Sequence, residues 1–156
     1  MAFRLSLIRH GAAEGAAEAI FGHSNPRLSK LGREQMDARW RELSAHPVDA
    51  IASSTLARCA DFALDAAMSL NLPLHLERGF NEMALGGIDG KPKLEWSTAD
   101  HTAWDLWQAD PERHRLAQAD VGLQRGAAAI AGAGVDLAIA DELVLRKDAD
   151  LGADAV

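Results

Sequence analysis

The stretch that decides the fold is FRLSLIRHG, residues 3–11. Its apolar side chains alternate with Arg4 and Ser6 before the apolar run ends at Ile8, so residues 2–8 are predicted to form a β-strand. An arginine, a histidine and a glycine follow this strand at once. Charged and nucleophilic side chains therefore stand at the carboxyl end of the first strand, which is where ligands bind in open α/β sheets.

Outward from this strand, helical and extended patterns alternate along the chain. Helices are predicted for residues 29–44, with Ser29 as the cap, for 56–70, for 97–107 and from Asp110 and Pro111 onward. Strands are predicted for residues 48–54, 72–76 and 135–140, and glycine-rich loops for residues 11–28 and 78–92. This alternation indicates a layered α/β fold with a mainly parallel sheet.

The composition limits the classes of protein to consider. The 156 residues carry 16 Lys plus Arg against 23 Asp plus Glu, a net charge of −7, which argues against a nucleic-acid partner. With 48% hydrophobic residues the chain can bury a core as a single domain spanning residues 1–156. Its one cysteine, Cys59, excludes an intramolecular disulfide and fits a reducing compartment. Because no apolar stretch suits a signal peptide or a membrane span, we expect a cytoplasmic protein without a membrane partner.

Four side chains suited to phosphate chemistry follow the predicted strands. Arg9 and His10 follow the first strand, and Glu82 follows the third. Arg58 lies in the first helical turn after the second strand, where free backbone N–H groups favour an anion. Arginines can clamp a phosphate, an imidazole can attack phosphorus, and a carboxylic acid can protonate the leaving oxygen. If these groups converge at one sheet edge, they make a phosphate-handling site.

The same residues carry a family resemblance. Four segments, in the family's order, resemble motifs of the histidine phosphatase superfamily, which includes the phosphoglycerate mutases: LIRHG (7–11), GHSNPRLSKLG (22–32), SSTLARCADFA (53–63) and NEMALGGIDG (81–90). The resemblance implies a three-layer sandwich with the sheet flanked by helices. It implies a phosphohistidine on His10, phosphate contacts from Arg9 and Arg58, a proton donor in Glu82, and neither metal nor cofactor. The segment 103–115 is similar to alpha-ribazole phosphatase-like members.

Other residues can be explained either by a role in function or by a role in packing. Gly22, His23 and Asn25 are candidates for substrate contact, although a plain loop histidine explains His23 equally well. The remaining histidines lack metal-ligand spacing, so no metal site is predicted. The helical stripe of three tryptophans (Trp96, Trp104 and Trp107) is interpreted as core or an interface, in preference to a substrate platform.

Departures from the family pattern bear on activity. Ala13 and Ala16 stand where a threonine and an asparagine are usual, Phe62 replaces another threonine, and Asp141 stands where a second histidine belongs. The region after Asp141 is expected to be shortened or altered. We predict a hydrolase acting on a small phosphorylated metabolite, with weak activity because of Asp141. The alternative is a catalytically impaired member of the same fold that only binds phosphate ligands, and homodimer formation is left open.

Overall fold

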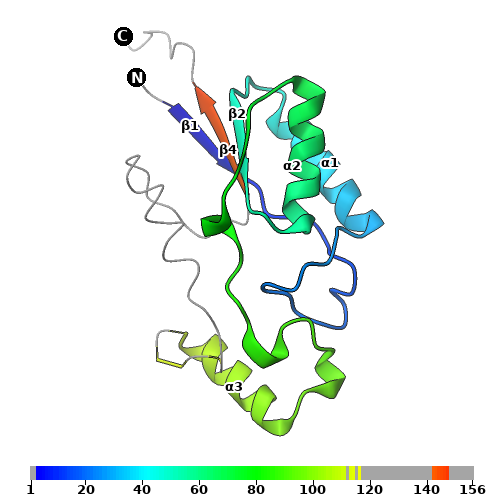
Figure 1. The fold of residues 1–156 in the computed structure, drawn as a ribbon, viewed down its shortest axis with the longest axis vertical. Helices are drawn as coiled ribbons and strands as arrows, with labels where there is room; N and C mark the ends of the chain where they lie inside the picture. The colour runs from blue at the N-terminus through cyan, green and yellow to red at the C-terminus, as the bar shows by residue number, and fades with distance from the viewer. Residues whose placement is uncertain (1–2, 112, 115, 117–141, 148–156) are drawn as a thin grey trace, which may run out of the picture.

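The computed structural model describes residues 3–111, 113–114, 116 and 142–147 (Figure 1). These residues form a four-stranded sheet with the order β1-β4-β2-β3. The strands are β1 (Phe3–Leu7), β2 (Ala50–Ser53), β3 (Leu74–Leu76) and β4 (Glu142–Lys147). Strands β1, β2 and β3 run in the same direction, as predicted, and β4 runs antiparallel to both of its neighbours.

Strand β4 is the part of the sheet that the sequence did not predict. It pairs in register with both neighbours, so that Leu145 lies between Leu5 of β1 and Ala50 of β2. The strand expected at residues 135–140 lies outside the described residues. Residues 142–147 were expected to follow a strand, but pairing on both sides satisfies their backbone groups and makes them one.

Helices α1 (Lys30–Leu43) and α2 (Ala57–Leu70) lie together against one face of the sheet (Figure 1). Ser29 caps α1 as predicted, because its Oγ accepts a hydrogen bond from the Gly32 N–H at 3.0 Å. The buried residues between these helices and the sheet form the sheet cluster: Ile8, Met36, Ile51, Phe62, Ala63, Ala66 and Ala67. The α/β class is thus confirmed, and the described residues show the sheet with a helical layer on this face.

After β3 the chain becomes irregular, with three short 3-10 helices, η1 (Arg78–Phe80), η2 (Gly86–Ile88) and η3 (Lys93–Glu95). Helix α3 (Thr98–Ala109) follows, and it begins with a reciprocal capping box between Ser97 and Asp100. A second apolar cluster, the tryptophan cluster, holds this region together. Its buried members are Leu85, Ile88, Trp96 and Leu116, with Trp104 and Trp107 packed against them.

The sequence predicts a helix from Asp110 and Pro111 onward, and the described residues do not form it. Asp110 ends α3, and among the described residues that follow it the chain makes only a turn. The Asp110 side chain accepts from the Arg113 N–H at 3.1 Å, and the Asp110 carbonyl accepts from the His114 N–H at 3.1 Å. Pro111 disfavours the helical conformation at the residue before it, which accounts for the end of α3. Across the described residues, no helix has the length and apolar character needed to cross a membrane.

Candidate active site

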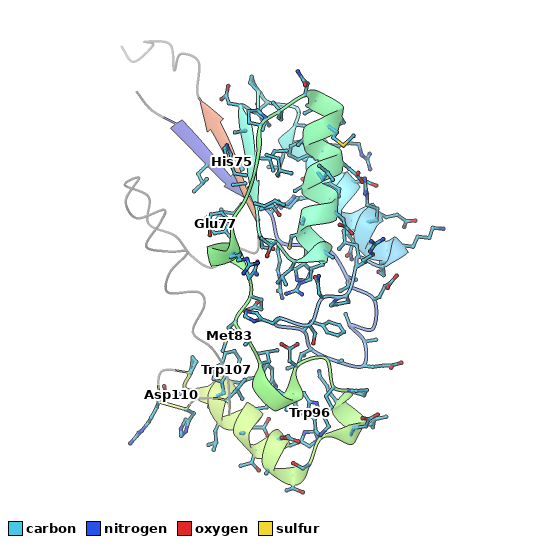
Figure 2. All side chains as sticks on the ribbon, viewed as in Figure 1. His75, Glu77, Met83, Trp96, Trp107 and Asp110 are labelled. Carbon is cyan, nitrogen blue, oxygen red and sulfur yellow. The ribbon has the colours of Figure 1, made fainter. Side chains whose placement is uncertain are left out.

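A cavity of about 400 Å³ opens at the carboxyl end of β1, between the loop after that strand, the loop after η1, and α3. Figure 2 shows Met83 and Trp107 where the loop after η1 approaches α3. The described residues that line it are Arg9, His10, Ala13, Ala16, Ala19, Ile20, Phe21, Glu82, Met83, Leu85, Trp104 and Trp107. Among these described residues, the charged ones are the three that the sequence singled out, and the others carry aliphatic, thioether or aromatic side chains.

The structure therefore brings Arg9, His10 and Glu82 together, as the sequence predicted. Arg58, Gly22, His23 and Asn25 are not among the described residues lining the cavity. Asp141, the residue at the expected second-histidine position, lies outside the described residues. The described part of the chain also contains no cluster of three or more side chains able to hold a metal ion.

The ring of His10 is oriented by its own backbone neighbour. Its Nδ1 lies 2.7 Å from the carbonyl oxygen of Gly11. Because a carbonyl oxygen can only accept, Nδ1 carries the proton, and in the neutral imidazole Nε2 keeps the lone pair. This hydrogen bond thus selects the tautomer with its proton on Nδ1, in which Nε2 is the basic ring nitrogen.

Two glycines explain why the chain can hold His10 in this position. A Cβ on Gly11 would lie 2.2 Å from the Gly32 carbonyl oxygen, and a Cβ on Gly32 would lie 2.0 Å from that of Ala12. The loop therefore packs backbone to backbone on the first turn of α1. The Ser29 N–H and Oγ both donate to the Ala12 carbonyl at 2.9 Å, which fastens this contact. Close packing against the backbone of Gly32 therefore requires a glycine at position 11, directly after His10.

Arg58 is 1% exposed, an unusual burial for a guanidinium group. Its Nη1 donates to the Ser24 carbonyl at 3.1 Å and its Nη2 to the Gly22 carbonyl at 3.0 Å. Its Nε is buried and, among the described residues, has no hydrogen-bond partner. Arg58 thus organises the loop at residues 22–24 and retains one unsatisfied donor, while its phosphate contact remains a prediction.

Asp89 holds the same loop through its backbone N–H groups, a role that sequence reasoning missed. Its carboxylate accepts from the backbone N–H groups of Gly22, His23 and Ser24 at 2.7 to 3.1 Å. Burial raises the pKa of this carboxyl, but hydrogen bonds from the Ser24 side chain and these three amides outweigh burial and hold the pKa below its usual value. The only signal in the sequence was an aspartate between glycines, which is common in turns.

Two asparagines tie the loops to the start of α2. Asn25 Oδ1 accepts from the Ala57 N–H at 2.6 Å, so the side chain proposed to contact substrate caps a helix that has no cap of its own. Asn81 Oδ1 accepts from the Thr55 N–H at 2.8 Å. The neighbouring Glu82 accepts from the Met83 N–H at 2.8 Å, which orients its carboxyl group. These bonds fix the loop that delivers Glu82 to the cavity.

The three tryptophans pack in the tryptophan cluster, as interpreted, and two of them also line the cavity. Trp96 is 7% exposed and donates its indole N–H to the Lys91 carbonyl at 3.0 Å, so it is core, as interpreted. Trp104 and Trp107, in contrast, line the cavity. Their rings stack with centroids 5.0 Å apart and planes 28° apart. The signal was their spacing of three on the helix that follows the Glu82 loop, which puts both on one face.

An α/β sheet with a histidine, an arginine and a glutamate in one cavity defines a class of protein. A comparison with models of known protein families identifies that class. Residues 5–131 match the model of the histidine phosphatase superfamily (branch 1), and the chain belongs to this superfamily.

One curated relative is a phosphatase, and another is a phosphoglycerate mutase of Candida albicans, 33% identical over 98 residues that cover 59% of this chain and 40% of the relative. The chain is 32% identical over 108 residues to a glucosyl-3-phosphoglycerate phosphatase of Mycolicibacterium vanbaalenii, covering 69% of this chain and 48% of the relative. It therefore spans about half the length of that curated relative.

Two solved structures share the fold. One is a mycobacterial glucosyl-3-phosphoglycerate phosphatase with VO3 (TM-score 0.70, 21% identity, 85% of this chain and 66% of the other). The other is the alpha-ribazole phosphatase of Shigella flexneri (TM-score 0.69, 20% identity, 84% and 66%).

Proposed function

We propose that the protein hydrolyses phosphate monoesters through a phosphohistidine on His10. The observation that carries this proposal is the 2.7 Å contact between His10 Nδ1 and the Gly11 carbonyl, in a cavity shared with Arg9 and Glu82. In the first step the Nε2 lone pair attacks phosphorus and the ester P–O bond breaks. Protonated Glu82 gives its proton to the leaving oxygen, which departs as the alcohol.

The second step returns the enzyme to its starting state. Glu82, now a carboxylate, takes a proton from water as the water oxygen attacks phosphorus and the P–N bond breaks. Inorganic phosphate is released and Glu82 is again protonated. The guanidinium of Arg9 supplies positive charge at the cavity, so this route uses neither metal nor cofactor.

Arg58 is included in the proposed phosphate site because of its unsatisfied Nε. A buried N–H without an acceptor is costly, and a phosphate oxygen would provide one. The guanidinium group also holds the loop at residues 22–24, and we include contacts of Gly22, His23 or Asn25 with the substrate. These contacts are part of the proposal.

The substrate is proposed to be a small phosphorylated metabolite in the cytoplasm, a location supported by a single buried cysteine that is not in a disulfide. The names of the relatives suggest where to begin, with glucosyl-3-phosphoglycerate and alpha-ribazole phosphate. A phosphate-release assay over a panel of metabolites that includes both will rank them by kcat/KM.

The mechanism is tested by trapping the covalent intermediate. After a rapid mixing experiment with 32P-labelled substrate, the phosphoprotein should be stable in base and labile in acid, as an N-phosphoryl bond is. His10→Ala should remove the label and lower turnover by orders of magnitude, whereas the exposed His75 on β3 serves as a matched control in His75→Ala. Label that survives acid, or turnover that survives His10→Ala, contradicts the proposal.

The second candidate function is phosphate-ligand binding with impaired catalysis, and the observation that favours it is Asp141 at the expected histidine position. Two unit charges at about 4 Å interact by about 4 kcal/mol at an effective dielectric of about 20, so a carboxylate beside a phosphate dianion would slow the reaction greatly. Asp141→His should then raise kcat/KM at least about tenfold, a change of about 1.4 kcal/mol in the barrier. An efficient wild-type enzyme unaffected by this change contradicts the second candidate.

A further inference from the structure

We propose that the alcohol portion of the substrate carries a flat aromatic ring, which binds in the cavity against the stacked Trp104 and Trp107. This inference rests on the proposed function, because it concerns the group that leaves when His10 takes the phosphoryl group. The chemistry of the residues that line the cavity indicates this class of substrate.

The described lining of the cavity consists of three charged residues and an apolar remainder. Arg9, His10 and Glu82 are the charged residues, while the others carry aliphatic, thioether or aromatic side chains. Among these described residues, the only side-chain hydrogen-bonding groups besides the charged ones are the indole N–H groups and the weakly accepting thioether of Met83. A cavity of about 400 Å³ is in the size range of small-molecule sites, so it has room for more than a phosphate group.

Such a wall discriminates against hydroxylated alcohols. A sugar or glycerol moiety would lose its hydrogen bonds to water on entering and would find few replacements, which weakens binding. Ala13 and Ala16 contribute to this wall, and neither offers a hydrogen-bonding side chain. An apolar group, in contrast, gains from leaving water.

The tryptophan geometry favours a flat ring over an apolar group of any shape. The Trp104 and Trp107 rings lie nearly parallel, with centroids 5.0 Å apart. The edge of Trp96 contacts Trp104 with centroids 5.9 Å apart at 68°, and Trp96 is itself held by its hydrogen bond to Lys91. The pair is therefore in place before the ligand arrives, and a preorganised aromatic surface suits stacking.

The test compares three phosphate esters of primary alcohols, so that the leaving oxygens have similar basicity. We expect kcat/KM for benzyl phosphate to exceed that for glycerol 3-phosphate at least about thirtyfold, and that for cyclohexylmethyl phosphate about threefold or more. Equal or better turnover of glycerol 3-phosphate overturns the inference while leaving the hydrolase function intact. Equal turnover of the benzyl and cyclohexylmethyl esters overturns the aromatic part.

A variant assigns the preference to the stacked pair. Trp107→Leu keeps the wall apolar but removes the flat surface, so kcat/KM for benzyl phosphate should fall about tenfold, and the ratio of kcat/KM for benzyl phosphate to that for glycerol 3-phosphate should fall at least about fivefold. Leu106→Ala is the matched control, because Leu106 lies on the same helix, is 45% exposed and is not among the described lining residues. Parallel losses for both esters in Trp107→Leu would show a structural effect and contradict the inference.

Binding of stable phosphonates separates this inference from the proposed function. Benzylphosphonate should bind at least about tenfold more tightly than methylphosphonate by calorimetry, and Trp107→Leu should remove the difference. If this holds without turnover of any ester, the aromatic binding surface stands and the hydrolase proposal fails. If the two phosphonates bind equally, or neither binds, the inference fails whatever the enzyme hydrolyses.

Discussion

The sheet cluster and the tryptophan cluster build the two sides of the cavity in different ways. On the sheet side, His10 lies two residues after Ile8 of the cluster, just past the end of β1, and backbone contact between Gly11 and Gly32 fixes its loop. On the tryptophan side, the wall comes from irregular loops and one helix, held by hydrogen bonds between side chains and backbone. The difference suggests that the reacting groups and the substrate wall can be altered separately by mutation.

The largest effect should come from the backbone contact beneath His10. Gly11→Ala places a Cβ 2.2 Å from the Gly32 carbonyl oxygen, so the backbone must move and carry the imidazole with it. We expect kcat/KM to fall at least about a hundredfold, since a displacement of about 1 Å can cost that much. Gly87→Ala is the control, because a Cβ there meets nothing described within 4 Å. Equal activity of the two variants would mean that the glycine contact does not position His10.

The next effect concerns Arg58, which joins the two sides. Arg58→Met fills a similar volume but leaves the Gly22 and Ser24 carbonyls without their donors, so the free energy of unfolding should fall by about 2–3 kcal/mol. Phosphate at 100 times its Kd should stabilise the wild type by about 2.7 kcal/mol, and the variant much less. Denaturant titrations with and without phosphate measure both.

Arg27 provides a matched control for Arg58. It is exposed and pairs with Asp61 across 3.5 Å, so Arg27→Met should change stability by less than about 1 kcal/mol and leave the phosphate effect intact. If Arg27→Met abolishes the phosphate effect and Arg58→Met does not, the anion binds on the surface and the proposed site is wrong.

A smaller effect is expected on the tryptophan side, from Asp89. The pKa of this carboxyl is lowered in the folded protein, so its stabilising contribution is present above its unfolded pKa, near 4, and is lost as pH falls through the lower folded value. Asp89→Asn removes the titrating group, so its free energy of unfolding should fall less steeply between pH 5 and about pH 2 than that of the wild type. At pH 7 the variant should be less stable by about 1 kcal/mol, and amide exchange at residues 22–24 should be faster. Identical pH profiles would show that Asp89 does not carry this bond network.

The smallest effect should come from the outer surface of α1 and α2, away from the cavity. Arg33 donates to Asp37 and Asp65 and lies 4.9 Å from the centre of the Phe62 ring. Because the pair with Asp65 is exposed, Asp65→Asn should cost only about 0.5 kcal/mol, and less at high salt. A loss of activity in this variant would contradict the division between the cavity and the outer surface.

Much of the sheet side could be predicted because its signals are local. The alternation at residues 3–8 predicts β1, Ser29 predicts the start of α1, and the motif at residues 9–11 places His10 at a strand end. Local patterns also predicted that Arg9, His10 and Glu82 would meet, since the carboxyl ends of parallel strands share one edge.

The rest depends on partners that are distant along the chain. Nothing local to ELVLRK shows that these residues pair with both β1 and β2, and nothing local to Asp89 shows that it bonds to residues 22–24. The helical spacing of Trp104 and Trp107 shows that they share a face, but the cavity that this face meets is built from loops. Such contacts become visible only when the chain is folded.

The place of β4 in the sheet has a consequence for synthesis on the ribosome. Phe3 pairs with Lys147 and Ala50 with Leu145, so the ladders that β4 forms with β1 and β2 join segments that are translated at very different times. While residues 142–147 are still to be made, β1 and β2 each present an unpaired edge to the cell. In the nascent chain, His10 therefore follows β1 before β4 is available to pair with that strand. Chaperones would matter most during this interval.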